Sequence, residues 1–118
     1  MTAPLVAVVD DDESVRESLP DLLRELGFMA RAFASAEEFL VSELLDDTEC
    51  LILDVAMPGM TGPALHHELL RRDRAIPIVF ITAHESACAK LLEAGAVDCL
   101  RKPFTETALL NAVTKALR

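Results

Sequence analysis

Basic residues are scarce in this chain. Its 118 residues include 11 Lys and Arg against 20 Asp and Glu, which gives a formal net charge of -9. Because affinity for nucleic-acid backbones depends mainly on Lys and Arg, this balance argues against direct nucleic-acid binding by this segment. We expect any DNA-binding activity to reside on another domain.

Long apolar runs are also missing. No apolar stretch approaches the ~20 residues that span a bilayer, and no basic N-terminal segment leads into an apolar run. Yet 52% of the residues are hydrophobic, which is enough for a sizeable core in one compact domain. No linker, repeat or low-complexity segment divides the chain. We therefore expect a soluble cytoplasmic protein with one domain, residues 1–118.

Cysteines are few and have no spacing typical of a metal site. Cys50, Cys88 and Cys99 are odd in number, and each lies within an apolar pattern. This placement favours reduced thiols in the core over metal ligands or nucleophiles.

Short apolar runs alternate along the chain with apolar residues at helical spacing. Gly27 ends the first helical pattern, Pro20 should bend that helix or cost it a hydrogen bond, and Ser35-Ala-Glu-Glu38 forms a capping box that opens the second. Five such repeats predict a (βα)5 fold, an α/β domain with a doubly wound parallel five-stranded sheet. The predicted strands are 5–9, 28–33, 50–53, 78–81 and 97–100. The third helix is predicted over about 62–72, a short fourth helix ends near Gly95, and Thr105 introduces the last. The residues predicted to point inward are Val15, Leu19, Leu22, Leu23 and Leu26 in the first helix, Phe39, Leu40 and Leu44 in the second, Leu65, Leu69 and Leu70 in the third, and Leu109, Leu110, Val113 and Leu117 in the last.

Polar side chains follow four of the apolar runs. They are Asp10 and Asp11 after 5–9, Asp54 after 50–53, Thr82 after 78–81, and Lys102 just past 97–100. Parallel strands end at one edge of a sheet, and open α/β sheets bind their ligands outside that edge. We therefore expect three carboxylates, a hydroxyl and an ammonium group around one crevice. Such a set can hold a magnesium ion, bind a phosphoryl group and offer Asp54 as its acceptor.

Each of these residues also has an ordinary structural interpretation. The acidic run 10–13 suits the first turn of a helix, where the helix dipole favours negative charge. Asp54 could be a turn residue before Met57-Pro58-Gly59, and Lys102 a solvated lysine before a turn. The common register counts against these interpretations, because independent surface residues would rarely converge on one edge.

A cluster of carboxylates favours a cation. Two like charges ~4 Å apart repel by ~4 kcal/mol at an effective dielectric constant of ~20, so such a site raises a carboxyl pKa or attracts a counter-ion. Magnesium fits best, since it prefers oxygen ligands and commonly combines one or two carboxylates with phosphate oxygens. No His or Cys lies in the turns after 5–9 and 50–53 to favour zinc.

Three segments resemble the receiver domain of bacterial two-component response regulators, and most of all its FixJ-type subgroup. They are Val9-Asp-Asp-Asp-Glu-Ser-Val-Arg16, Asp54-Val-Ala-Met-Pro-Gly-Met-Thr-Gly62 and Ala94-Gly-Ala-Val-Asp98. The resemblance spans the whole chain, and separate blocks agree in type and order. It implies the flavodoxin-like receiver topology.

The resemblance also implies a role for each site residue. Asp54 would be the phospho-acceptor, with Thr82 contacting one phosphoryl oxygen through its hydroxyl and Lys102 pairing with another. Asp10, Asp11, Asp54 and the backbone carbonyl of Ala56 would hold Mg²⁺, with Asp10 acting through water. Lys102-Pro103 matches a family pair that often has a cis peptide bond.

The implied reaction is transfer of a phosphoryl group from a sensor histidine kinase to Asp54, followed by a conformational shift or altered association. The domain would catalyse only its own phosphorylation and dephosphorylation, and in that sense it is not an enzyme. The resemblance allows a homodimer through the face of the fourth helix and fifth strand, and an effector domain beyond residue 118. It implies no direct nucleic-acid or membrane partner for this segment.

The chain departs from the family pattern in three places. Cys99 stands three residues before Lys102, where a switch aromatic is usual, and a core thiol there would transmit no gated side-chain rotation. The stretch from Thr82 to Lys102 is about two residues shorter than is typical. Ala56 is small where a larger polar residue is common, and His84 lies two residues after Thr82.

Other functions fit the sequence less well. A degenerate receiver that serves only as a docking module should lack the chemical residues, and all are present. A magnesium-dependent aspartyl phosphohydrolase needs an acid/base carboxylate two residues after Asp54, where this chain has Ala56. A flavodoxin-like nucleotide site is weaker still, since no Gly-rich phosphate loop follows the first strand.

Overall fold

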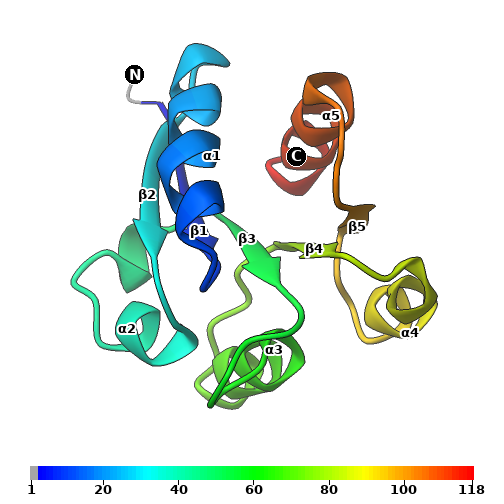
Figure 1. Ribbon diagram of the computed structural model, residues 1–118. Helices are drawn as coiled ribbons and strands as arrows, with labels where there is room; N and C mark the ends of the chain where they lie inside the picture. The colour runs from blue at the N-terminus through cyan, green and yellow to red at the C-terminus, as the bar shows by residue number, and fades with distance from the viewer. Residues whose placement is uncertain (1–2) are drawn as a thin grey trace.

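A computed structural model describes residues 3–118 and contains a five-stranded parallel sheet. The spatial order of the strands is β2-β1-β3-β4-β5. Their bounds are Leu5–Val9 for β1, Met29–Phe33 for β2, Cys50–Asp54 for β3, Ile78–Thr82 for β4 and Asp98–Arg101 for β5. The predicted (βα)5 architecture is confirmed (Figure 1).

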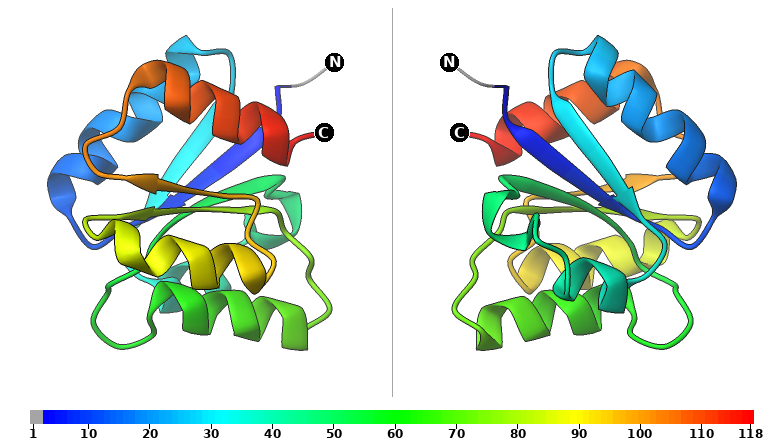
Figure 2. Two further views of the ribbon diagram at one scale, coloured as in Figure 1. Left: turned by 90° about the vertical axis from the view of Figure 1, so that its right-hand side faces the viewer. Right: turned by 90° about the vertical axis from the view of Figure 1, so that its left-hand side faces the viewer.

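Helices cover both faces of the sheet. Figure 2 shows α1 and α5 on one face, with α3 and α4 on the other. The helices are α1 (Glu13–Glu25), α2 (Ala36–Leu40), α3 (Gly62–Arg71), α4 (Cys88–Glu93) and α5 (Glu106–Ala116), with short 3-10 turns η1 (Leu45–Asp47) and η2 (Glu85–Ala87). One buried cluster joins residues of α2, α3 and α4 to the sheet, and the other joins residues of α1 and α5 to its opposite face. The sheet is therefore covered on both faces, and the place left for a site is at the carboxyl ends of the strands.

Local sequence signals account for most helix starts. Ser35 and Thr105 cap α2 and α5 by accepting hydrogen bonds from backbone N–H groups three residues on, and Thr61 does the same for α3. The Ser35 capping box is formed only in part: Ser35 accepts from the Glu38 N–H at 3.0 Å, but the Glu38 carboxylate accepts from the N–H of Ala34, at 3.1 Å, rather than from that of Ser35.

Two predicted details of the helices differ in the structure. Helix α2 ends at Leu40, so Leu44 lies beyond it, although its side chain still packs against the cluster under α2. Leu70, predicted to point inward, is instead exposed on α3. Helix α1 continues through Pro20, which has no N–H and therefore costs the helix one hydrogen bond, as predicted. Gly27 follows with a φ of 101°, the left-handed conformation that glycine adopts at a helix end.

The prediction of three reduced core thiols is wrong for two of them. Cys88 and Cys99 form a disulfide, and both are half-buried rather than enclosed in the core. The sequence pattern failed here because it treated the two apolar segments separately, whereas the fold brings the first residue of α4 against β5. Cys50 is a free, fully buried thiol as predicted.

Among residues 3–118, no helix has both the length and the apolar composition needed to cross a bilayer.

Candidate functional site

The strand register brings the predicted site residues to one edge of the sheet. Val9 is aligned with Leu53, so Asp10 and Asp11 follow β1 at the level where Asp54 ends β3. Asp54 is in turn aligned with Ile81, and Thr82 with Arg101. Four separate segments of the sequence therefore bring five residues to this edge: Asp10, Asp11, Asp54, Thr82 and Lys102.

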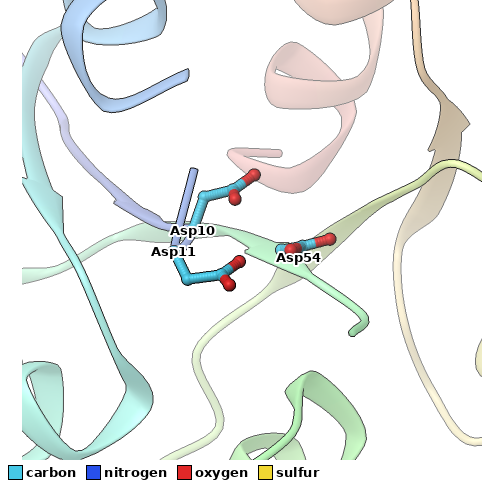
Figure 3. Close-up of side chains that lie close together, drawn as sticks. All are labelled: Asp10, Asp11 and Asp54. Carbon is cyan, nitrogen blue, oxygen red and sulfur yellow. The ribbon is translucent and has the colours of Figure 1, made fainter. Parts of the chain in front are cut away.

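Three carboxylates form the acidic part of this edge. One oxygen from each of Asp10, Asp11 and Asp54 lies within 4.8 Å of the others. Figure 3 shows the three side chains on the ends of two neighbouring strands, directed into a shared space. Asp10 and Asp54 are buried, whereas Asp11 is exposed. The cluster is thus anchored in the protein and open to solvent on one side.

Asp10 is held by several neighbours. Its Oδ2 accepts a hydrogen bond from Lys102 Nζ at 2.9 Å, and its Oδ1 accepts one from the Asp12 backbone N–H at 2.9 Å. The Arg16 guanidinium donates to the Asp10 backbone carbonyl at 3.1 Å. Both carboxylate oxygens of a fully buried side chain are therefore satisfied, which fixes its orientation.

Lys102 connects the two buried carboxylates. Its Nζ lies 2.9 Å from Asp10 and 3.6 Å from Asp54, and its backbone N–H donates to the Thr82 carbonyl at 2.7 Å. Burial opposes the charged ammonium, but the hydrogen bond and charge of Asp10 outweigh it and raise the Lys102 pKa. The peptide bond from Lys102 to Pro103 is cis. Lys102 therefore places a positive charge between Asp10 and Asp54.

Asp54 is destabilised as an anion. Burial raises the pKa of its carboxyl from 3.8 to about 6, and the neighbouring charge of Asp10 acts in the same direction. Lys102 offsets part of this effect, and Asp11 adds to it. The excess negative charge makes this edge attractive to a cation, as the sequence predicted.

Thr82 is engaged by the loop that follows it. Its buried hydroxyl accepts a hydrogen bond from the His84 backbone N–H at 3.0 Å and donates to the His84 carbonyl at 3.3 Å. The single hydroxyl proton of Thr82 is therefore bound by the His84 carbonyl, and donation to a phosphoryl oxygen requires that bond to break.

The loop from β3 to α3 is held close to the acidic cluster. The Gly62 N–H donates to the Val55 carbonyl at 3.1 Å, and a Cβ on Gly62 would overlap the backbone carbonyl oxygen of Asp54. Ala56 lies in this loop and is exposed, so its small side chain leaves the approach to Asp54 open.

Sequence reasoning missed two supporting residues, Asp12 and Arg16. Asp12 caps α1 through its side chain, and its backbone N–H binds Asp10. A signal for Arg16 was present, because helical side chains lean toward the helix N-terminus and a basic residue one turn into α1 can reach back to the acidic loop. The bond between Thr82 and His84 had no comparable signal.

Comparison with known sequences identifies the family. The sequence model of the response regulator receiver domain matches residues 6–114. The chain belongs to this family. Nodulation protein W of Bradyrhizobium diazoefficiens is 45% identical to this receiver domain over 117 residues, which is 98% of this chain and 52% of that protein. The receiver domain spans about half the length of the curated relatives it matches.

Solved structures agree with this assignment. The crystal structure of FixJ-N has a TM-score of 0.88 and 35% identity, covering 99% of this receiver domain and 95% of that chain. The response regulator TrrA of Thermotoga maritima, solved in complex with Mg²⁺ and BeF, has a TM-score of 0.86 and 28% identity, covering 99% of this receiver domain and all of that chain (100%). The flavodoxin-like receiver fold and the place of this domain in two-component signalling are thereby established.

Proposed function

We propose that Asp54 accepts a phosphoryl group from the phosphohistidine of a sensor histidine kinase, in a reaction that depends on magnesium. The observation that carries this proposal is the position of Asp54, which lies beside Asp10 and Asp11 and 3.6 Å from the Lys102 ammonium. An acceptor carboxylate, a cation site and a fixed positive charge thus share one edge of the sheet.

The donor set suits magnesium. It consists of oxygen atoms alone, with carboxylates of Asp10, Asp11 and Asp54 close together, and the predicted fourth ligand is the backbone carbonyl of Ala56. Bound there, magnesium would offset negative charge on the phosphoryl oxygens. The complex of TrrA with Mg²⁺ and BeF supports this proposal by relationship.

In the proposed reaction, a carboxylate oxygen of Asp54 attacks phosphorus in line with the leaving nitrogen. The new O–P bond forms as the N–P bond breaks, and the imidazole takes the electron pair. Lys102 offsets charge on one equatorial oxygen while remaining hydrogen-bonded to Asp10. Thr82 contacts another oxygen after its hydroxyl proton leaves the His84 carbonyl. The domain therefore catalyses its own modification and does not turn over a separate substrate.

The signal would follow as a population shift. A phosphoryl group that engages Thr82 and Lys102 stabilises whichever conformation brings these groups closer to Asp54. We infer that this conformation alters the face of α4 and β5 and that a second copy of the domain binds there. We also infer that a cytoplasmic effector domain beyond residue 118 responds to this change. The length of the curated relatives supports a further domain.

The first test is phosphorylation by acetyl phosphate in the presence of Mg²⁺. We expect a base-labile phosphoryl group on Asp54, located by mass spectrometry, and its loss in Asp54→Asn or on chelation of Mg²⁺. Asp47→Asn is the matched control, since it removes an exposed carboxylate from η1 and should leave the modification intact. A phosphoryl group on another residue, or none in the wild-type protein, would contradict the proposal and favour a docking module.

A further inference from the structure

Two cysteines join the segment after Thr82 to the last strand. Cys88 begins α4 and Cys99 lies in β5, with their Cα atoms 5.5 Å apart, within the usual span of a disulfide. Both are half-buried, so a small reagent can reach them, whereas Cys50 is fully buried. The pair lies outside the acidic cluster, and the proposed phosphorylation chemistry does not use it.

The disulfide completes a ring that contains residues 83–87. In this loop, the His84 backbone is hydrogen-bonded to the Thr82 hydroxyl. At one end of residues 83–87, the Thr82 carbonyl accepts a hydrogen bond from the Lys102 backbone N–H at 2.7 Å. At the other end, Cys88 is covalently tied to Cys99, three residues before Lys102 in sequence. Both ends of the loop are therefore fixed against the same short segment of chain.

Residues 83–87 bind the hydroxyl proton that Thr82 would donate to a phosphoryl oxygen. The Thr82 hydroxyl is bound to both the backbone N–H and the carbonyl of His84, inside the closed ring. Donation to a phosphoryl oxygen breaks the bond to the His84 carbonyl and so removes one of the two bonds that hold His84 to Thr82. Reduction of the disulfide releases one end of the loop, whereas oxidation keeps that end in place.

We propose that Cys88 and Cys99 form a redox site that controls phosphoryl binding, with the disulfide holding the loop in the conformation that occupies Thr82. The inference rests on the proposed function of Asp54. It assigns the pair a regulatory role in this chain, at the position where a switch aromatic was expected.

The chemistry is thiol–disulfide exchange with a low-molecular-weight disulfide. One cysteine thiolate attacks that disulfide and displaces one thiol, and the second cysteine then attacks the mixed disulfide and displaces the other. The two cysteines lose two electrons and two protons and form one S–S bond. The reagent gains both electrons and both protons and becomes two thiols.

The test compares oxidised and reduced wild-type protein. The redox state of each sample is first established by intact mass and thiol counting. Each is then titrated by calorimetry, at saturating Mg²⁺, with beryllium fluoride as a mimic of the phosphoryl group. We expect at least about fivefold weaker binding by the oxidised form, the lower end of typical coupling between sites. By reciprocity, saturating Mg²⁺ and beryllium fluoride should shift the equilibrium of the pair with a thiol/disulfide buffer toward the dithiol by the same factor.

Matched variants isolate the pair. Cys88→Ser and Cys99→Ser should bind beryllium fluoride equally under oxidising and reducing conditions, whereas Cys50→Ser should keep the wild-type redox response. Burial raises the pKa of the Cys50 thiol to about 12, so this residue is a poor partner for exchange.

Equal binding by the oxidised and reduced wild-type protein would overturn the redox proposal and leave the function of Asp54 standing. Failure of the pair to oxidise in a thiol/disulfide buffer, or a redox response that persists in Cys88→Ser, would overturn it too. Failure of the reduced wild-type protein to bind beryllium fluoride would instead overturn the proposed function itself, and this inference with it.

Discussion

Asp54 is a buried carboxyl among other carboxylates. Burial raises its pKa from 3.8 to about 6, with Asp10 adding to the effect. Because the folded chain holds this proton more tightly than the unfolded chain, the free energy of unfolding should fall as pH rises through this interval. Ionised Asp54 therefore destabilises the cation-free domain at neutral pH.

Asp54→Asn should remove the destabilisation that comes from ionising Asp54. Without divalent cations we expect its free energy of unfolding to exceed the wild-type value by about 1–3 kcal/mol at pH 7, and by almost nothing at pH 4. Urea denaturation across this pH range measures the difference, with Asp47→Asn as an exposed control. A difference that does not change with pH would contradict the account of Asp54.

Ala56 lies two residues after Asp54, the proposed acceptor. Its exposed, small side chain leaves room for an in-line water, so we predict that phosphorylated Ala56→Arg loses its phosphoryl group no faster than the wild-type domain. Decay rates of the two phosphorylated proteins in Mg²⁺ provide the measurement. Markedly faster decay in Ala56→Arg would show that steric access is the wrong explanation.

At the scale of elements, the start of α3 is packed against the end of β3. A Cβ on Gly62 would overlap the Asp54 carbonyl oxygen and lie 3.0 Å from the Phe80 ring. We expect Gly62→Ala to displace the loop from β3 to α3, to lower the free energy of unfolding by about 1–3 kcal/mol, and to slow phosphorylation of Asp54. Urea denaturation and the rate of modification by acetyl phosphate measure the two effects.

Gly27→Ala provides the control for this prediction. Gly27 has a φ of 101° but open space around it, and it lies at the end of α1 away from the site. The variant should lose stability through backbone strain while keeping the wild-type phosphorylation rate. If Gly62→Ala also keeps that rate, the close contact does not position the acceptor.

The elements were largely predictable because their signals are local. Apolar runs gave the strands, and Ser35 and Thr105 marked helix starts through bonds to nearby backbone N–H groups. The alignment of Asp10, Asp11, Asp54, Thr82 and Lys102 followed from a general property of parallel sheets. Their chemical roles remain predictions for the experiments above.

Features that depend on tertiary contact were less accessible to sequence reasoning. The pairing of Cys88 with Cys99 requires α4 to pack its first residue against β5, and no local pattern reports that contact. The bond of Thr82 to His84 depends on the path of one loop. Leu44 fitted a helical period, yet α2 ends before it at Leu40.

At the scale of the whole molecule, the proposed dimer through α4 and β5 can be tested at an exposed leucine. Leu92 is 44% exposed on α4, while Leu70 is 52% exposed on α3. If phosphorylation promotes dimers through α4 and β5, then Mg²⁺ and beryllium fluoride should increase the sedimentation coefficient of the reduced wild-type domain. Leu92→Asp should weaken this increase at least about tenfold in dimer dissociation constant, by burying an unpaired charge.

Leu70→Asp is the matched control for that surface. It introduces the same charge at a similarly exposed leucine on a different helix, and it should associate like the wild-type domain. Equal loss of association in both variants would place the effect in the total charge, which is already -9, rather than in the face of α4.

The most direct test of the central claim is a crystal structure of the reduced domain with Mg²⁺ and beryllium fluoride. The account predicts beryllium bonded to a carboxylate oxygen of Asp54, Mg²⁺ held directly by Asp11, Asp54 and the Ala56 carbonyl and through water by Asp10, and fluorine contacts from Lys102 and from the Thr82 hydroxyl. Beryllium fluoride bound elsewhere, or bound at Asp54 with the Thr82 hydroxyl out of contact with fluorine, would contradict it.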